Sequence, residues 1–375
     1  MPDGQQTIAH AFNDQGYHTA WFGKWHVDGA KQSEGRTAHW IVPPERRGGF
    51  QEWIGYENNN SQWDCWVHGG EGDNAFLRQL DGFETDGLTN LLLDYLQQRQ
   101  DSGSDQPFFA ALSVQPPHWP TQCPPEYRKL RGDEVSLRPN VPPGGKGERI
   151  MRAHGPGYYG MIENWDWNVG RVLAALRRLG LAHTTHVMVF ADHGDMLGSH
   201  GRNGKVLPYE ESIRTPFIIS GDNFYYNQMR SGATDALINH VDIAPTTLGL
   251  CGIEAPGWME GHDYSHVRDR RRKPERSDPD CAYIQAIEDR EESPAYRGIV
   301  TKDGWKYACT AKAPWVMFNL NNDPFEMDNQ AQIASPEVRA KRAELHARLT
   351  AKIEEVGDDF PLPEANPETT ANGRN

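Results

Sequence analysis

The chain has 375 residues, of which 38 are basic and 52 acidic, giving a formal net charge of −14. This length exceeds one average domain, so we expect one large and one small domain. The acidic balance excludes a nucleic-acid or anionic-membrane surface as the main function, because either would require a basic patch. No apolar run approaches the roughly 18 residues of a membrane span. The first seven residues lack the basic and apolar regions of a signal peptide.

Helical and strand patterns alternate over the first 250 residues. We expect helices over residues 7–15, 85–98, 158–179 and 242–250, and strands over 17–22, 107–114, 186–191 and 215–220. This alternation predicts a large α/β/α sandwich with a mostly parallel sheet. Residues 29–83 are polar and rich in Gly and Trp, with no sustained period, so we expect an insertion beside the active site.

The pattern changes beyond residue 252. Short strands are expected over residues 283–287, 296–301, 305–309 and 316–319, followed by a helix over 335–356. They predict a small C-terminal α+β domain with an antiparallel sheet, and the composition of the last 15 or so residues predicts disorder. We therefore place the α/β domain at residues 1–253 and the small domain at 254–375.

The cysteines favour neither a disulfide framework nor a zinc site. They are odd in number, widely spaced and never in a C-x-x-C pair. Their positions are Cys65, Cys123, Cys251, Cys281 and Cys309.

Three of the expected strands are followed directly by polar, reactive side chains. In open α/β sheets, ligands collect beyond the carboxyl ends of the strands. If these strands are parallel neighbours, all of their polar groups face one crevice. The residues are Lys24 and His26 after the first strand, His118 after the second, and Asp192, His193 and then Lys205 after the third.

These residue types share one chemistry. An Asp-His pair can hold a divalent cation, and lysines bind a tetrahedral oxyanion as point charges. A metal offsets charge in the transition state, and a histidine can donate a proton to a leaving alcohol. The combination predicts sulfuryl or phosphoryl transfer, although each residue alone also fits a structural role, such as a satisfied histidine, a solvated lysine or a helix cap.

Several segments resemble the type I sulfatases of the alkaline phosphatase-like superfamily, in order and spacing. They are "GYHTAWFGKWH", "VQPPHWP", "YYGMIENWDWNVGRVL", "FADHGDMLGSHGRNGK", "PYEESIRTPFIISG" and "HVDIAPTTLGLCGI". The C-terminal "YRGIVTKDGWKYACT" and "FNLNNDPFEMDNQ" also look like the small domain of that family. The resemblance covers nearly the whole chain and implies a sulfuric ester hydrolase.

The resemblance implies a role for each residue of the constellation. Lys24 and His26 would contact the sulfate and the nucleophile, and His118 would donate a proton to the leaving group. Lys205 would bind a sulfate oxygen. Asp192 and His193 would ligate the metal, usually Ca²⁺ in this family. Residues 209–214 are also typical of the family, and we interpret them as a structural turn with an internal ion pair.

Two parts of the family pattern are missing. The family's nucleophile is the Cys or Ser of C/S-x-P/A-S-R, oxidised to formylglycine, and no such motif occurs here; Cys123 precedes a proline but lacks the Ser and Arg. The adjacent pair of metal-binding aspartates is also missing, because Asp358 and Asp359 have no strand before them. We therefore expect an N-terminally truncated sulfatase, lacking a central strand and with little or no activity, which the genomic sequence upstream of the Met1 codon would test.

Two other functions stay open. A phosphodiesterase or phosphonate monoester hydrolase of the same superfamily also shows Asp-His-Gly followed by a lysine. A degenerate sulfatase-like domain could instead bind sulfated glycans without turnover. We favour a carbohydrate sulfate ester over a small aryl sulfate, because Trp40, Trp53, Trp63, Trp66 and Trp119 would fit a sugar-stacking wall, although packing in the core or in loops is the stronger explanation for most of them. The chain would be exported if a preceding segment carried a signal peptide, and cytoplasmic otherwise.

Overall fold

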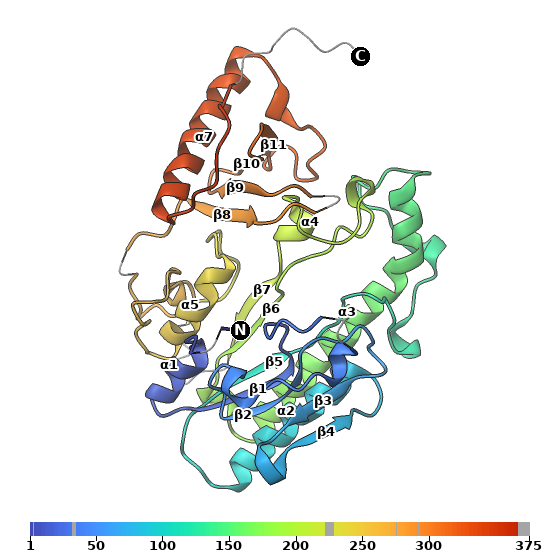
Figure 1. Cartoon of the computed structure of the whole chain (residues 1–375), viewed down its shortest axis with the longest axis vertical. Coiled ribbons are helices and arrows are strands. Elements are labelled where there is room, and N and C mark those ends of the chain that lie inside the picture. Colours follow the sequence, from blue (N-terminus) through green and yellow to red (C-terminus); the bar gives the residue numbers. More distant parts are fainter. Residues whose placement is uncertain (3, 32–34, 222–228, 275, 291–292, 367–375) are drawn as a thin grey trace.

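The computed structural model describes residues 1–366 except 3, 32–34, 222–228, 275 and 291–292. An α/β part occupies the lower half of Figure 1, and a second sheet with its helix lies above it. Within the described residues, no helix combines the length and apolar character needed to cross a membrane.

A five-stranded sheet forms the centre of the α/β part, in the order β4-β3-β2-β1-β5. Its middle is parallel: β1 pairs with β2 on one side and β5 on the other, whereas β3 and β4 extend the edge as antiparallel strands. The strands are β1 (His18–Lys24), β2 (Glu52–Tyr56), β3 (Trp66–Gly69), β4 (Phe76–Gln79) and β5 (Phe108–Ser113).

Our expectation for residues 29–83 was wrong, because they contain β2, β3 and β4. The strands are only four or five residues long. In segments this short, the alternation of buried and exposed residues is too brief to stand out among the surrounding Gly and Trp residues. Their backbones nevertheless complete the hydrogen bonding of β1, which would otherwise be an edge strand.

The helices of the α/β part bury their apolar faces against this sheet. Leu88, Leu92 and Leu96 of α2 are almost fully buried and belong to one core cluster with Phe22 of β1. Helix α2 packs in turn on α3. The helices are α1 (Ile8–Asp14), α2 (Glu84–Asp101), α3 (Lys146–Arg178) and the short α4 (Glu210–Ile213), α5 (Ile243–Leu250) and α6 (Ser265–Arg268).

Helix α3 begins at Lys146, well before the expected residue 158. The earlier turns contain a Gly-Pro-Gly sequence at residues 155–157, which hid the helical pattern because Gly and Pro disfavour helix interiors. The glycines permit close contact: a Cβ at Gly157 would lie 2.0 Å from the carbonyl oxygen of Thr121. The connection that follows His118 therefore lies directly on α3.

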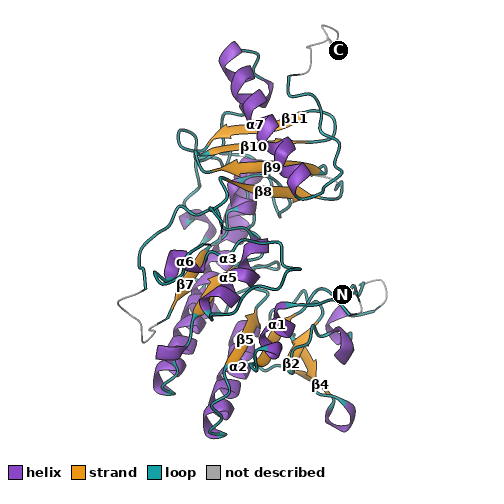
Figure 2. Ribbon diagram, turned by 90° about the vertical axis from the view of Figure 1, so that its left-hand side faces the viewer, coloured by secondary structure: helices purple, strands orange, loops and turns teal. Residues whose placement is uncertain are grey.

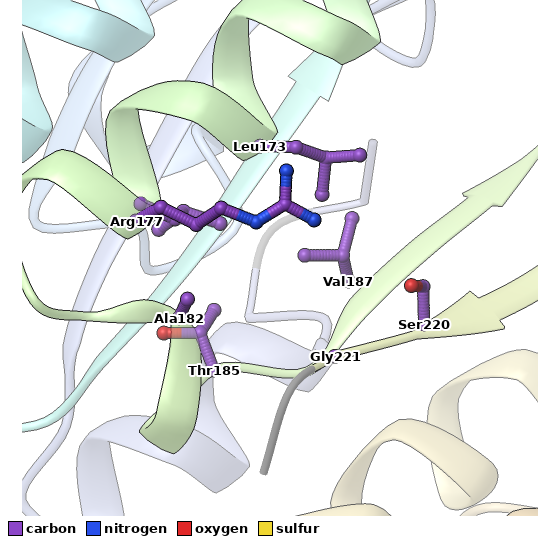
Figure 3. A pocket seen from close by; sticks show the side chains of 8 residues that line it. Leu173, Arg177, Ala182, Thr185, Val187, Ser220 and Gly221 are labelled. Atoms are coloured by element: carbon purple, nitrogen blue, oxygen red, sulfur yellow. The ribbon is translucent and has the colours of Figure 1, made fainter.

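Strands β6 (Val187–Phe190) and β7 (Phe217–Ser220) form a separate two-stranded antiparallel ladder. The single crevice was expected on the condition that the three strands are parallel neighbours. Strands β1 and β5 are, whereas in the described residues no ladder joins β6 to either of them. A small cavity of about 20 Å³ lies between Val187, Ser220 and the end of α3, and its lining side chains are drawn in Figure 3. The ladder leaves apolar side chains in solvent: Ile218 is 55% exposed and Phe190 46%.

Replacing Ile218 with threonine should reduce binding of a hydrophobic dye and light scattering on warming. Threonine keeps the β-branched shape that suits a strand but removes exposed apolar surface. Because the side chain is mostly in water, the free energy of unfolding should change by no more than about 0.5 kcal/mol. A loss of several times that amount would show that Ile218 is packed in solution.

The upper part contains an antiparallel sheet in the order β11-β10-β9-β8, as the sequence predicted. Figure 2 shows α7 lying across these strands. Leu345, Leu349 and Ile353 of α7 form a core cluster with Ile299 and Tyr307 of the sheet. The elements are β8 (Cys281–Ala286), β9 (Tyr296–Thr301), β10 (Trp305–Cys309), β11 (Pro314–Asn319) and α7 (Pro336–Glu355).

Candidate active site

The end of β1 places Lys24 and His26. Gly23 adopts a positive φ of 109°, and a Cβ there would lie 2.0 Å from the Ser113 carbonyl oxygen, so only glycine lets β1 and β5 approach this closely. Beyond the strand, the His26 amide donates to the Glu57 carbonyl at 2.8 Å. His26 itself has a φ of 53°, a left-handed conformation that is uncommon for a non-glycine residue and typical of functional sites.

The connection after β5 places His118. Its Nδ1 lies 2.7 Å from the Trp119 carbonyl oxygen, which can only accept, so Nδ1 carries a proton and Nε2 keeps its lone pair. The Gln62 side chain donates to the carbonyl oxygen of His118 at 2.8 Å, and the Trp119 indole donates to Asp195 at 3.2 Å. The last contact ties this connection to the segment after β6.

The segment after β6 brings Asp192, His193 and Lys205 into direct contact. His193 Nδ1 lies 2.8 Å from the Gly194 carbonyl oxygen, which fixes the ring with the proton on Nδ1 and the lone pair on Nε2. That Nε2 is 2.8 Å from Lys205 Nζ and 3.2 Å from an Asp192 carboxylate oxygen. Gly194 is required here, because a Cβ would lie 1.9 Å from the Glu211 carbonyl oxygen.

The structure brings all six predicted site residues together, even though β6 does not join the central sheet. Burial is the main cause that lowers the pKa of Lys24, and the charge of Lys205 lowers it further. Burial also lowers the pKa of His118, with added effects from both lysines and His193. The pKa of His26 is lowered by burial and by Lys24. The charges of Lys24 and Lys205 repel each other in this site, and a bound oxyanion would relieve that repulsion.

Asp192 and His193 suit a divalent cation in ligand type and direction. The Asp192 side chain is 86% exposed, and its carboxylate lies beside the unprotonated Nε2 of His193. A metal-ligating histidine usually donates its other ring N–H to a carbonyl, as Nδ1 does here to Gly194. These two residues supply only part of a Ca²⁺ shell, which takes six to eight oxygen-rich ligands.

A large cleft runs from these residues to the C-terminal sheet. Its volume is about 1,080 Å³. Asp192, His193 and Lys205 line one side, and Tyr283 of β8 lines the other. Arg290, which follows β8, also lines the cleft and is close enough to Lys205 for its charge to lower the pKa of that lysine.

Sequence reasoning missed Glu84, a fully buried carboxylate at the start of α2. Its Oε1 accepts from the Tyr56 hydroxyl at 2.7 Å and from the Gln115 amide at 2.8 Å, whereas its buried Oε2 has no hydrogen-bond partner within the described part of the chain. Burial raises the pKa of Glu84 to about 7, although nearby Lys24 lowers it. A glutamate in the first turn of a helix is usually a surface residue, so no pattern in the sequence singles it out.

The other sequence expectations have mixed outcomes. Trp53 is only 4% exposed and packs in a core cluster with Trp25, so it cannot stack on a sugar, whereas Trp40 and Trp63 are 37% and 40% exposed. Within residues 209–214, Glu210–Ile213 form the short helix α4 where we expected a turn, and the expected internal ion pair joins Arg214 and Glu210 at 3.6 Å.

Neither Asp358 nor Cys123 replaces a missing part of the family pattern. The Asp358 carboxylate is paired with Arg297. Cys123 lies against α3, where a Cβ added at Gly160 would be 2.5 Å from its sulfur, and burial raises the pKa of the Cys123 thiol. A buried thiol with a raised pKa is a poor nucleophile.

The chain belongs to the sulfatase family. The sulfatase family model matches residues 1–253, and a model described as N-sulphoglucosamine sulphohydrolase, C-terminal, matches residues 198–355. An ulvan-active sulfatase of Formosa agariphila is 31% identical over 366 residues, covering 96% of this chain and 68% of that protein. An endo-4-O-sulfatase of Bacteroides thetaiotaomicron is 24% identical, with 96% of this chain and 75% of that protein covered.

Solved structures share the fold. The sulfatase yidJ of Bacteroides fragilis superposes with a TM-score of 0.82 at 24% identity, covering 96% of this chain and 79% of that one. A protein solved in complex with its substrate D-glucosamine-2-N,6-O-disulfate gives a TM-score of 0.77 at 21% identity, covering 96% and 84%. The two-part architecture of this chain is therefore the sulfatase fold.

Proposed function

We propose that the site formed by the ends of β1, β5 and β6 binds the sulfate group of a sulfate ester and supports its hydrolysis. The observation that carries this proposal is that Lys24 and Lys205 are close enough to interact electrostatically with each other and with His118, which also interacts with His193. The charge of Asp192 acts on Lys24 in the same site. Lysine ammonium groups bind tetrahedral oxyanions as point charges. In this proposal Lys24 and Lys205 hold sulfate oxygens, and His26 contacts the sulfate on the side of the nucleophile.

The proposed proton donor to the leaving alcohol is His118. Its Nδ1 proton is held by the Trp119 carbonyl, so Nε2 is the atom that can take up and deliver a proton. The lowered pKa of His118 keeps it neutral at neutral pH in the free protein. A bound sulfate would offset the two lysine charges that contribute to this lowering, which favours protonation at Nε2 when substrate is present.

Asp192 and His193 are the residues that would hold a Ca²⁺ ion, the usual metal of the family. When bound, such an ion neutralises charge on the sulfate oxygens. The protein's own contribution is the fixed ring of His193, whose Nε2 now contacts Lys205 Nζ. Ion binding would require Lys205 to turn from His193, which frees its ammonium group for the sulfate.

A sulfated carbohydrate is the substrate class that we propose. The relatives named an ulvan-active sulfatase and an endo-4-O-sulfatase support it. The cleft supports it as well, because its volume of about 1,080 Å³ exceeds what one aryl sulfate would fill.

The 375 residues contain no C/S-x-P/A-S-R motif, from which the family forms its formylglycine. We therefore propose that this chain by itself binds sulfate esters but turns them over poorly or not at all. The test is to incubate the purified chain with a sulfated oligosaccharide and Ca²⁺, measuring binding by calorimetry and free sulfate by ion chromatography. Binding without sulfate release supports the proposal, whereas release at ordinary enzyme rates contradicts the impairment.

Replacing Lys205 with alanine should weaken the binding of a sulfated oligosaccharide by about 10- to 100-fold, the range for losing one charge-assisted hydrogen bond. Calorimetric titration of both proteins in the presence of Ca²⁺ measures the change. Lys312→Ala, at an exposed position in the C-terminal sheet region, is the matched control and should bind as the unaltered chain does. Equal weakening by the two substitutions would mean that the ligand follows overall charge and not this site.

A further inference from the structure

His262, His266 and Asp278 form a second cluster of metal-ligand type, separate in sequence from the sulfate site. Nε2 of His262 lies 3.0 Å from Asp278 Oδ1, and Nε2 of His266 lies 3.2 Å from the same oxygen. The ligating atoms of all three residues lie within 4.8 Å of one another. Both histidines are largely buried, with side-chain exposures of 3% and 15%.

We propose that this cluster, His262, His266 and Asp278, binds a borderline divalent cation such as Zn²⁺. Two imidazoles and one carboxylate are a ligand set that zinc accepts, with a fourth position left to water. At zinc–ligand distances near 2.0–2.1 Å, neighbouring ligands of a tetrahedral site are about 3.3 Å apart. The two N–O separations in the cluster are close to that value, and the two imidazole planes, 82° apart, direct their Nε2 atoms from different sides.

Protonation decides whether the cluster is a metal site or a hydrogen-bonded one. Metal binding requires each histidine to carry its proton on Nδ1. His266 can do so, because its buried Nδ1 has no hydrogen-bond partner among the residues that the structure describes. In His262 this tautomer is disfavoured, because Arg276 Nε lies 3.2 Å from its Nδ1 and donates a hydrogen bond to it.

Arg276 has other acceptors, so it can release His262 at modest cost. Its Nη2 lies 3.3 Å from the carbonyl oxygens of Glu260 and of Gly261. The proposal therefore includes a competition: the metal gains His262 when Arg276 gives up its contact with Nδ1. This competition makes an unusual prediction, that removing Arg276 strengthens metal binding.

The cluster lies where the chain passes from the α/β part to the upper sheet, so a bound metal would connect these two parts. His262 and His266 belong to the segment around α6, whereas Asp278 lies three residues before Cys281, the first residue of β8. Figure 1 shows this connection joining the α/β part to the upper sheet. His262 and Arg276 also line the cleft, together with Tyr283 of β8. A bound ion would fasten the start of β8 to the α/β part and so fix the width of the cleft.

The test uses the full chain, stripped of metal and then titrated with ZnCl₂ in millimolar Ca²⁺, which occupies any site that prefers hard oxygen ligands. Calorimetry gives the stoichiometry, Co²⁺ substitution gives a ligand-field spectrum, and thermal unfolding with and without Zn²⁺ gives the stabilisation. His266→Gln and Asp278→Asn keep hydrogen-bonding groups of similar shape. His183→Gln, an exposed histidine elsewhere in the chain, is the matched control.

We expect one zinc equivalent to be lost in His266→Gln and in Asp278→Asn but kept in His183→Gln. Arg276→Gln should bind zinc more tightly than the unaltered chain. Zinc should raise the Tm only of the proteins that keep the site. Equal stoichiometry in all variants would overturn the proposal, because the cluster would then be a hydrogen-bonded network alone. Zinc binding that is lost in His266→Gln but unchanged or weakened in Arg276→Gln would overturn the proposed competition between the metal and Arg276. Unfolding of the variants measured in chelator separates a folding defect from loss of the metal.

Discussion

Replacing Lys306 with methionine is expected to lower the free energy of unfolding by about 3–5 kcal/mol, the cost of leaving buried charges without their partner. Lys306 of β10 is fully buried, and its Nζ lies 2.6 Å from Glu326 and 2.7 Å from Glu210. Methionine fills a similar volume, so the lost charge accounts for most of the effect. Burial already raises the pKa of Glu326 while Lys306 lowers it, so removing the lysine should make the loss largest at high pH, where Glu326 is ionised.

Urea unfolding at pH 5 and pH 8 measures this effect. Lys302→Met is the matched control, because Lys302 lies in the turn after β9 and is exposed, and its change should stay within about 0.5 kcal/mol. A loss of less than about 1 kcal/mol in Lys306→Met would mean that the two glutamates take up protons or water without strain.

The same lysine bears on the active site, because it bridges two parts of the chain. Glu210 begins α4, which directly follows the loop that carries Lys205, and Glu326 belongs to the C-terminal region. The Glu210 amide also donates to Glu326 at 2.8 Å. The buried charges therefore fix α4 against the upper sheet, and with it the side of the cleft on which Lys205 lies. A Lys306→Met chain that still folds should consequently bind sulfated ligands more weakly.

The sequence predicted the parts of this site that depend on strand ends. Lys24, His118 and Asp192 each follow an apolar run, and such runs can be recognised without any knowledge of neighbours. The end of each run is set by the local sequence. In the structure, the strands end within one or two residues of the predicted positions. The fold class followed for the same reason, since alternation of strands and helices leaves few architectures.

The parts that failed depend on contacts between distant segments. Nothing local shows that β6 pairs with β7 in a separate ladder, because pairing partners are set by tertiary packing. The early start of α3 was hidden by residues 155–157, where Gly157 leaves the space that the backbone of Thr121 occupies. Glu84 was missed because its burial comes from Tyr56 and Gln115, which lie about 30 residues away on either side.

Replacing Glu84 with glutamine should stabilise the protein at pH 8 but not at pH 5. Burial raises the pKa of Glu84 from its ordinary 4.5 to about 7. At a pH between these two pKa values, the folded chain binds more protons than the unfolded chain. The free energy of unfolding therefore falls as the pH rises through this range and levels off above it. Glutamine does not titrate, and its Oε1 can accept from Tyr56 and Gln115 as the carboxylate does. The advantage of the variant should therefore grow with pH to at most about 3 kcal/mol.

Unfolding free energies of both proteins at pH 5, 6, 7 and 8 would resolve this curve. Glu126→Gln, at an exposed position, is the control and should give a difference that does not change over the same range. If the Glu84→Gln advantage were equal at pH 5 and pH 8, Glu84 would be ionised throughout, with Lys24 as its counterion. Lys24 would then be committed to Glu84 and less available to a sulfate, and Glu84→Gln should tighten the binding of sulfated ligands instead. Measuring the free energy of unfolding and the ligand affinity of the same variant therefore distinguishes two states of Glu84. Either its carboxyl group takes up a proton over this pH range, or it stays ionised and pairs with Lys24.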